Sequence, residues 1–538
     1  MKDTSHRSAY AHAYAYLFLT EEARINLPKF QYKGQDKSLL YNHVLSPLAS
    51  FLVNNCTPSW VAPNVITLFG LCWMVASYSF LWYYAPAVST PPDDYDSSIP
   101  SWLFLFHCCA MIIYQTLDNM DGKQARRTGS SSPLGLLFDH GCDAINSIFG
   151  SAGWIVGLGL TLDHDYYFCL AIILGPFAVF YVATWEEYFT GELILPVING
   201  PNEGLLGGAL LSLTTCFFPD FWQSTSVSGS LGLHHILPGP IRNADIQVSL
   251  AIFGMLQELL LKTTNVSRRY GFQTLLHQAP LWVLIASFLL NTDLWLFMPR
   301  TALHLSSGLF VEIVTQLMLD HISDQDYNVG RRFLLFLPLF ILPFFGEFAT
   351  DYWLIYTTVV WTFMFCKIRC VVHEICCTLD LKCFEITSKN KSAWVPSYLA
   401  IRCYRELVGF CCRPAFVWYT RADWLYYNIN AITSSHRHGT GKSSIHTSRN
   451  VMTSAGKLFQ RIAVSICIRV WQGNVETRSV LRSTLDGSDM SINERVSTED
   501  RGVVLNVFPV VIFSCQFRCH LERCFDLMVS NSIYWVIC

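Results

Sequence analysis

Long blocks of apolar residues recur along the chain between about residues 64 and 377. Most are long enough to cross the roughly 30 Å hydrocarbon core of a bilayer as α-helices. Hydrophobic residues make up 52% of the chain and charged residues 14%, whereas a soluble protein has about 25% charged residues. This composition excludes a disordered or fibrous chain. The sequence therefore predicts an all-α polytopic integral membrane protein.

We expect about ten transmembrane helices from these blocks. The expected spans are 64–85, 101–120, 134–160, 166–187, 201–219, 246–262, 273–291, 301–320, 333–346 and 352–377.

Lysine and arginine predict the orientation, because short cytosolic loops retain them and translocated loops largely lack them. Neither residue occurs between Lys37 and Lys123, so the loop after the first span is expected on the far side of the membrane. The basic residues expected in cytosolic loops are Lys123, Arg126, Arg127, Lys262, Arg268, Arg269, Arg331 and Arg332. Arg242 and Arg300 are isolated exceptions. Both termini are then cytosolic.

Charge and cysteine usage exclude two other classes of protein. The formal net charge is −3, so the chain lacks the basic surplus that holds a nucleic-acid backbone, and no nucleic-acid partner is expected. The 20 cysteines are scattered without paired CxxC motifs, and we interpret them as buried thiols.

Two flanking segments differ from the apolar middle. Residues 1–57 are expected to be a cytosolic amphipathic segment, because their aromatic stretch has too many polar interruptions for a signal peptide. Residues 58–387 form the predicted transmembrane domain. Residues 388–538 are expected to be a cytosolic, poorly ordered extension, since their longest apolar piece is too short to span. A folded regulatory domain is the alternative for this extension.

Four aspartates lie in two adjacent predicted spans. Asp118 and Asp121 are three residues apart, and Asp139 and Asp143 are four apart, so each pair shares one helical face. A charge at the centre of a span costs about 2.5–3.5 kcal/mol, so the cluster needs a cationic partner. Carboxylate oxygens are preferred by Mg²⁺ and Mn²⁺, which also retain phosphate oxygens. The pattern predicts a metal site for phosphates; the alternative is pairing with nearby Lys and Arg side chains.

Small residues and one arginine lie between the two pairs of aspartates. Gly122 leaves room for a ligand beside Asp121, and Ala125 keeps the next turn small. Gly135 has the corresponding place at the start of the second helix. Arg126 can form a bidentate contact with a phosphate.

These residues make up a known pattern: Asp-x-x-Asp-Gly-x-x-Ala-Arg, eight residues, then Gly-x-x-x-Asp-x-x-x-Asp, over residues 118–143. At every fixed position of this pattern, the chain resembles the CDP-alcohol phosphatidyltransferase family. The segments DGKQARRT, SSSPLG and LFDHGCD resemble the eukaryotic choline/ethanolamine phosphotransferases. Further segments look most like the plant aminoalcohol phosphotransferases: FQYKGQDKSLL (30–40), WVAPNVITLFG (60–70), TWEEYFTGELILPVINGPNEG (184–204) and VVHEICCTLDLKCFEIT (371–387). The similarity covers roughly residues 20–387.

The resemblance implies a reaction and a setting. Phosphocholine or phosphoethanolamine passes from the CDP-alcohol to diacylglycerol, giving phosphatidylcholine or phosphatidylethanolamine and CMP, the last step of the Kennedy pathway. It implies two Mg²⁺ or Mn²⁺ ions, which suit in-line phosphoryl-type transfer when about 4 Å apart. It also implies a ten-helix homodimer of the endoplasmic reticulum or Golgi, with its active site on the cytosolic side.

The resemblance also implies the role of each residue. The implied metal ligands are Asp118, Asp121, Asp139 and Asp143. The residues implied beside the nucleotide are Asn64, Thr67, Gly122, Ala125, Arg126 and Gly135.

A hydroxyl nucleophile also needs a base within reach. The candidates are His140 and a metal-free oxygen of Asp143. In the eukaryotic branch of the family, a histidine at the position of His140 is the expected proton acceptor.

One position departs from that branch. The usual Gly-Glu-Leu-Phe-Asp-His is Gly-Leu-Leu-Phe-Asp-His here, with Leu136 in place of the glutamate. A glutamate there lies one turn before His140 and can orient its imidazole, which Leu136 cannot do. Another carboxylate can replace it, and the candidates are Glu186, Glu187 and Glu374.

Two other functions are compatible with parts of the sequence. An ion-coupled transporter also carries intramembrane carboxylates, but here they cluster in one segment and do not recur in matching halves. A pseudoenzyme that regulates a partner is the alternative suggested by Leu136.

Overall fold

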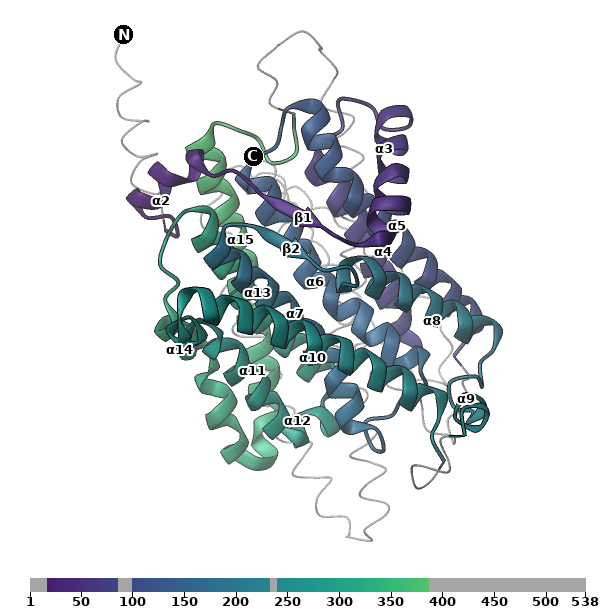
Figure 1. The fold of residues 1–538 in the computed structure, drawn as a ribbon. Coiled ribbons are helices and arrows are strands. Elements are labelled where there is room, and N and C mark those ends of the chain that lie inside the picture. The colour runs from purple at the N-terminus through teal and green to yellow at the C-terminus, as the bar shows by residue number, and fades with distance from the viewer. Residues whose placement is uncertain (1–16, 86–98, 233–239, 387–538) are drawn as a thin grey trace, which may run out of the picture. The chain divides into compact units, whose positions relative to one another are not determined.

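The computed structural model describes residues 17–85, 99–232 and 240–386 (Figure 1). Backbone contacts divide the chain into two units, Met1–Asn428 and Ile429–Cys538, and every described residue belongs to the first. The predicted extension 388–538 and residues 1–16 of the predicted N-terminal segment lie outside the described residues.

The described part of the chain is built mainly from α-helices, as the sequence predicts (Figure 1). The longer helices are α4 (Pro63–Tyr84), α5 (Ser101–Thr128), α6 (Pro133–Gly157), α7 (Tyr166–Thr190), α8 (Leu205–Phe217), α10 (Asn243–Tyr270), α11 (Ala279–Leu290), α13 (Pro299–Ile322), α14 (Val329–Ile341) and α15 (Ala349–Leu379). The shorter helices are α2 (Glu21–Asn26), α3 (Ser46–Asn55), α9 (Ser226–Ser230) and α12 (Thr292–Phe297). Short 3-10 or π helices occupy Leu27–Lys29, Tyr41–Leu45, Gly200–Gly204, Phe272–Gln278 and Leu342–Phe348.

Seven helical segments among the described residues are long and apolar enough to cross a membrane. They are Pro63–Tyr84, Tyr166–Thr190, Asn243–Tyr270, Phe272–Leu290, Pro299–Ile322, Val329–Gly346 and Thr350–Leu379. The protein is therefore an integral membrane protein, but the expected count of ten spans is not confirmed. Helices α5 and α6 carry the four aspartates and are not among the seven, and α8 has only 13 residues.

The turn between α5 and α6 brings the two halves of the acidic motif together. After Thr128, Gly129 adopts φ 64°, a left-handed conformation that glycine reaches without a steric penalty. Ser132 then caps α6 by accepting a hydrogen bond from the Gly135 N–H at 3.1 Å, and Pro133 occupies the first turn. Both helices pack against α4, which therefore forms a common wall behind the motif.

The N-terminal segment covers the ends of α6, α13 and α15. Leu19, Ala23 and Leu27 are buried in an apolar cluster with side chains of those three helices. The backbone N–H groups of residues 17–19 donate hydrogen bonds to the Glu374 carboxylate at 2.7–3.2 Å. This segment is therefore fixed to the helices by both apolar and polar contacts.

A short parallel strand pair continues this cover. Strand β1 (Gly34–Asp36) pairs with β2 (Leu193–Leu195), with Gly34 opposite Leu193, and the two strands lie side by side in Figure 1. Lys262 of α10 donates to the Ile194 carbonyl at 2.8 Å and pairs with Glu186 of α7 at 2.5 Å. The strand pair is thereby tied to α7 and α10.

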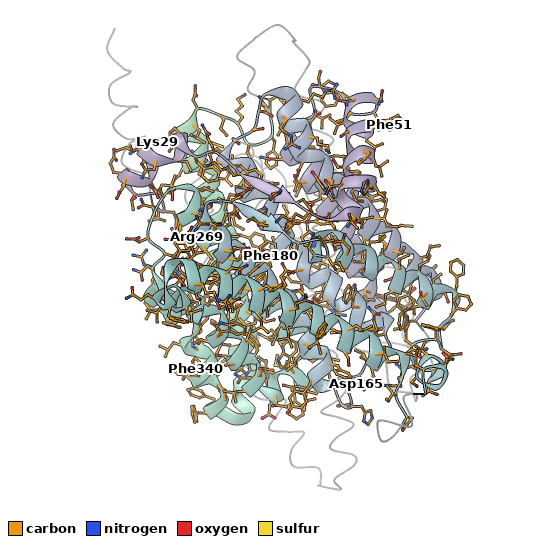
Figure 2. All side chains as sticks on the ribbon, viewed as in Figure 1. Lys29, Phe51, Asp165, Phe180, Arg269 and Phe340 are labelled. Carbon is orange, nitrogen blue, oxygen red and sulfur yellow. The ribbon has the colours of Figure 1, made fainter. Side chains whose placement is uncertain are left out.

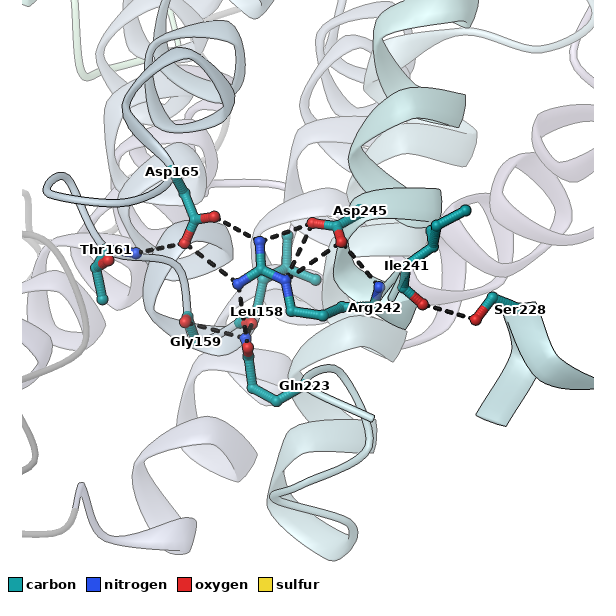
Figure 3. Close-up of polar contacts among 9 residues, drawn as sticks. All are labelled: Leu158, Gly159, Thr161, Asp165, Gln223, Ser228, Ile241, Arg242 and Asp245. Carbon is teal, nitrogen blue, oxygen red and sulfur yellow. Dashed lines mark hydrogen bonds and ion pairs between the residues drawn. The ribbon is translucent and has the colours of Figure 1, made fainter. Parts of the chain in front are cut away.

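Arg242, one exception to the predicted charge alternation, is neutralised by carboxylates (Figure 3). Its guanidinium pairs with Asp245 at 2.7 Å and with Asp165 at 2.5 Å. Hydrogen bonds to Asp245 and Asp165 raise the pKa of Arg242. Two acidic groups therefore offset the charge of Arg242 at the start of α10.

Arg300, the other exception, is buried inside the bundle. Its guanidinium carbon lies 5.2 Å from the ring centre of Tyr78 and 4.9 Å from that of Trp82, both on α4. It also donates a hydrogen bond to the Ala85 carbonyl at the end of the same helix. This arginine therefore stabilises the packing of α13 on α4 and is not a loop charge.

Candidate active site

Three of the four predicted metal ligands lie together between α5 and α6. Asp118 and Asp121 of α5 and Asp139 of α6 each offer one oxygen, and these oxygens lie within 4.8 Å of one another. Asp121 is 7% exposed, and the other two are half-buried. The predicted sharing of a helical face thus brings these carboxylates into one cluster, which we call the aspartate cluster.

The fourth predicted ligand, Asp143, lies beside this cluster. Its Oδ1 atom accepts a hydrogen bond from the Tyr114 hydroxyl at 2.5 Å. It is also close enough to Asp118 for the two carboxyl groups to interact. Sequence reasoning missed Tyr114, although it lies one turn before Asp118 on the same face of α5.

The aspartate cluster fits a metal by its chemistry. The buried Oδ1 atoms of Asp118 and Asp139 have no hydrogen-bond partner among the described residues. Carboxylates gathered in a largely buried place repel one another unless a cation offsets their charge. Hard oxygen donors of this kind suit divalent cations such as Mg²⁺ or Mn²⁺. The cluster could therefore hold a metal ion.

The nearby basic side chains do not pair with these aspartates within the described structure. Lys123 donates to the Ser46 hydroxyl at 2.8 Å. Arg127 donates to the Thr57 carbonyl at 2.8 Å and so holds the end of α3. The alternative of a simple surface ion-pair cluster is thus not observed.

Arg126 is exposed and lies over Gly122. A Cβ atom added to Gly122 would lie 3.6 Å from Nη1 of Arg126, an ordinary contact. The Arg126 side chain makes no hydrogen bond or ion pair with another described residue. Its guanidinium is thus available to an anion beside Gly122, while Ala125 is half-buried in the next turn.

The two predicted residues of α4 have different contacts. The Thr67 hydroxyl is buried and donates a hydrogen bond to Oδ2 of Asp121. Asn64 donates to the Cys383 carbonyl at 2.8 Å, and its Oδ1 lies 3.8 Å from where a Cβ at Gly135 would be. Thr67 therefore supports the aspartate cluster directly, whereas Asn64 joins the start of α4 to the segment after α15.

His140 lies one residue beyond Asp139 on α6. Its Nδ1 atom is buried and has no hydrogen-bond partner among the described residues. Its ring meets the edge of Phe180 on α7 at 6.2 Å between ring centres, and Phe180 is labelled in Figure 2. Leu136, one turn earlier, packs against the apolar cluster of the N-terminal segment.

The three candidate replacement carboxylates have separate partners. Glu186 pairs with Lys262, and Glu374 accepts the N-terminal backbone hydrogen bonds. Glu187 is 1% exposed, and its Oε1 lies 3.7 Å from Nε2 of His321 on α13. The Oε2 atom of Glu187 has no partner among the described residues. Glu187 therefore has a buried oxygen that is uncommitted within the described part of the chain.

Tyr32 and His321 were not singled out from the sequence. Tyr32 keeps 49% of its side chain exposed, but burial around its hydroxyl raises its pKa. The carboxylates of Glu187 and Asp139 raise the pKa of Tyr32 further, so this hydroxyl lies near both groups. The motif gave no signal for these two residues, since they reach the site from the N-terminal segment and from α13.

The chain is similar in sequence to several known proteins. Residues 60–193 match the CDP-alcohol phosphatidyltransferase family profile. The chain is 32% identical over 398 residues to choline/ethanolaminephosphotransferase 1 of Arabidopsis thaliana, covering 68% of this chain and 97% of that protein. It is also 32% identical over 396 residues to choline/ethanolaminephosphotransferase 2 of the same plant, with the same coverage. Over 256 residues it is 34% identical to choline/ethanolaminephosphotransferase 1 of Saccharomyces cerevisiae, covering 46% of this chain and 61% of that protein.

Proposed function

Because the chain belongs to the CDP-alcohol phosphatidyltransferase family, we propose that it transfers phosphocholine or phosphoethanolamine from a CDP-alcohol to diacylglycerol. The products are phosphatidylcholine or phosphatidylethanolamine and CMP. The observation that carries the proposal is the aspartate cluster, with its buried and unpartnered oxygens between α5 and α6. The transporter and pseudoenzyme alternatives have no comparable support, since the similar proteins are named as transferases.

The reaction needs a base that accepts the proton of the diacylglycerol hydroxyl. The diacylglycerol hydroxyl oxygen attacks the phosphorus that carries the amino alcohol, a new P–O bond forms, and the P–O bond to CMP breaks. The hydroxyl proton must pass to a protein group. His140 is the proposed acceptor, because its Nδ1 is unpartnered beside Asp139. An oxygen of Asp143 is the second choice, and its Oδ1 atom already accepts a hydrogen bond from the Tyr114 hydroxyl.

The proposed metal ligands are Asp118, Asp121, Asp139 and Asp143. Two divalent cations, Mg²⁺ or Mn²⁺, would supply charge neutralisation at the pyrophosphate. Thr67 orients Asp121 through its hydroxyl. The distances among the cluster oxygens support Asp118, Asp121 and Asp139 as ligands, and Asp143 lies beside them.

The proposed nucleotide side of the site is formed by small residues and one cation. Arg126 binds a phosphate oxygen, and its exposed guanidinium over Gly122 supports this role. Gly122, Ala125 and Gly135 let the nucleotide approach the helix backbones. Asn64 and Thr67 border this region from α4, where Asn64 lies beside Gly135.

Leu136 occupies the position where the pattern of the eukaryotic branch has a glutamate. We propose that a carboxylate outside the motif takes over the role of that glutamate. Glu187 supports His140 through His321, because it is buried, has a free oxygen and lies 3.7 Å from His321. His321 is itself close enough to His140 for their charges to interact.

The proposed setting of the enzyme follows from the orientation and the resemblance. The Lys- and Arg-bearing loops, and with them the aspartate cluster, face the cytosol of the endoplasmic reticulum or Golgi. Residues 1–57 form a cytosolic segment, 58–387 the transmembrane domain, and 388–538 a cytosolic extension. The working assembly is a homodimer.

The proposed function is tested by assaying one membrane preparation with each of the two CDP-alcohols. Microsomes from cells without endogenous activity, expressing this chain, are assayed with CDP-choline or CDP-ethanolamine and diacylglycerol, with Mn²⁺ or Mg²⁺. We expect metal-dependent formation of at least one phospholipid and stoichiometric CMP. An Asp118→Ala preparation expressed to the same level is the matched control. Absence of both products in the presence of either metal would overturn the proposal.

A further inference from the structure

A polar cavity of about 200 Å³ lies where the N-terminal segment, the last turns of α13 and the start of α14 meet. Gln316, Asp320 and Ser323 line one wall, and their spacing of three and four residues places them on one face of α13. One water needs about 10–15 Å³ of such space, and drug-sized ligands occupy about 300–1,000 Å³. The cavity therefore suits a small polar group.

Opposite charges line the rim of this cavity without pairing. Asp326 and Arg331 are both exposed and both line it. Within the described ranges, neither side chain makes a hydrogen bond or ion pair, with the other or with a third residue. The rim therefore presents a free carboxylate and a free guanidinium to the same small space.

A second pair of opposite charges lies deeper. Asp320 accepts a hydrogen bond from Gln316 at 2.8 Å. Arg332 is 6% exposed and donates to Glu312, which Lys367 also contacts at 2.9 Å. Because two cations share that carboxylate, Arg332 retains donor capacity, and its buried Nε has no partner among the described residues.

We propose that this cavity binds the zwitterionic phosphoester of an amino alcohol, the headgroup of a membrane phospholipid. Its phosphate faces Arg331 and Arg332 at the N-terminal end of α14, and its ammonium faces Asp326 and Asp320. A simple anion would meet two carboxylates there, and a simple cation would meet two guanidinium groups. A ligand that carries both charges satisfies all four residues.

The position of the cavity favours a lipid over a soluble ester. Both α13 and α14 belong to segments that can cross a membrane, so the connection between Ile322 and Val329 lies where lipid headgroups lie. The cavity contains no residue of the aspartate cluster, and His321, next to Asp320, is directed to Glu187. The site is therefore separate from the proposed active site and does not depend on the proposed function.

Binding of a monomeric short-chain lipid tests the site. The full-length protein, purified in a non-ionic detergent with EDTA present, is titrated with radiolabelled dihexanoyl phosphatidylcholine by equilibrium dialysis. We expect Arg331→Ala and Asp326→Asn each to weaken binding by about fivefold, as for one exposed charged contact. Asp326→Asn should bind dihexanoyl phosphatidic acid at least as tightly as the wild type, since this lipid has no ammonium group.

Three comparisons complete the test. Arg268→Ala removes an exposed arginine on the same predicted side, away from the cavity, and should bind like the wild type. Arg331→Lys keeps the charge and should recover most of the affinity, which excludes misfolding as the cause. Wild-type affinity in both Arg331→Ala and Asp326→Asn would overturn the proposal. Displacement by glycerophosphocholine should need about tenfold more competitor than displacement by the lipid, and equal potency would overturn the lipid assignment.

Discussion

The Oε1 atom of Glu187 lies 3.7 Å from the Nε2 atom of His321, inside the bundle and near His140. The two residues come from α7 and α13, whereas His140 belongs to α6. This pair introduces a buried carboxylate at the site where Leu136 supplies none. The contact joins α7 to α13, two helices outside the acidic motif.

Replacement of Glu187 with glutamine should lower kcat by about tenfold or more, in the range for residues that orient a functional group through a second one. KM for the CDP-alcohol should change little, because Glu187 is 1% exposed and lies behind His321. Steady-state kinetics in microsomes measure both values. Glu22→Gln, an exposed glutamate of α2, is the matched control. Full activity of the Glu187→Gln enzyme would remove Glu187 from the site.

Removal of divalent metal should abolish activity, and Mn²⁺ or Mg²⁺ should restore it. Asp118→Ala, Asp121→Ala and Asp139→Ala should each lower turnover by at least about 100-fold, since each removes one oxygen from the aspartate cluster. Carbonate extraction of the membranes checks that the variants remain inserted. Near-normal turnover in any of the three would contradict the metal assignment.

Loss of the Thr67 hydroxyl should weaken the metal site without removing a ligand. Thr67→Val deletes the hydrogen bond to Asp121, so the Mn²⁺ concentration for half-maximal activity should rise about 10–100-fold. Turnover at saturating Mn²⁺ should recover much of the wild-type value. Thr116→Val on α5, whose hydroxyl bonds within its own helix, is the control. An unchanged metal requirement would show that Thr67 does not orient Asp121.

The acidic motif could be predicted from sequence because its geometry is local. Spacings of three and four residues place Asp118 with Asp121, and a glycine turn at Gly129 returns the chain directly into α6. Long-range partners carry no such local signal. The pairing of Glu187 with His321 depends on how α7 and α13 pack. The sequence therefore predicted Glu187 only as one of three candidate carboxylates.

The span count and the N-terminal cover were harder to predict for related reasons. Helix α8 begins only at Leu205, after the π turn at Gly200–Gly204, so the expected span 201–219 is shorter than its apolar composition suggests. Strand β1 has three residues, too few for an alternating pattern. Its pairing with β2 becomes visible only once α7 has been placed.

Truncation after Ser388 should leave an inserted and active enzyme. All matched motifs and the candidate spans among the described residues end before that residue. The longest apolar piece in the sequence of residues 388–538 is too short to span. Carbonate extraction and phospholipid synthesis are measured for the truncated and full-length chains at equal expression. Loss of insertion, or of all activity, would mean that the extension is part of the transmembrane domain.

The last prediction concerns His140 and Leu136, which lies where the pattern of the eukaryotic branch has a glutamate. If His140 takes the proton from diacylglycerol, His140→Ala should lower turnover by about 10²-fold or more, the usual range for a lost general base. CDP-alcohol binding should change little, because the phosphates are proposed to bind at Arg126 and the aspartate cluster.

Leu136→Glu then tests whether a carboxylate one turn before His140 still improves this base. Turnover at neutral pH should rise if Glu187 and His321 support His140 only in part, and the gain should vanish in the His140→Ala background. Leu136 packs on the apolar cluster of the N-terminal segment, so a glutamate there also loses apolar contact. Leu136→Gln is the control, because glutamine has nearly the shape of glutamate but no charge. It therefore separates the loss of apolar packing from the effect of the carboxylate on His140. An equal gain without His140 would show that proton removal does not run through this pair of residues.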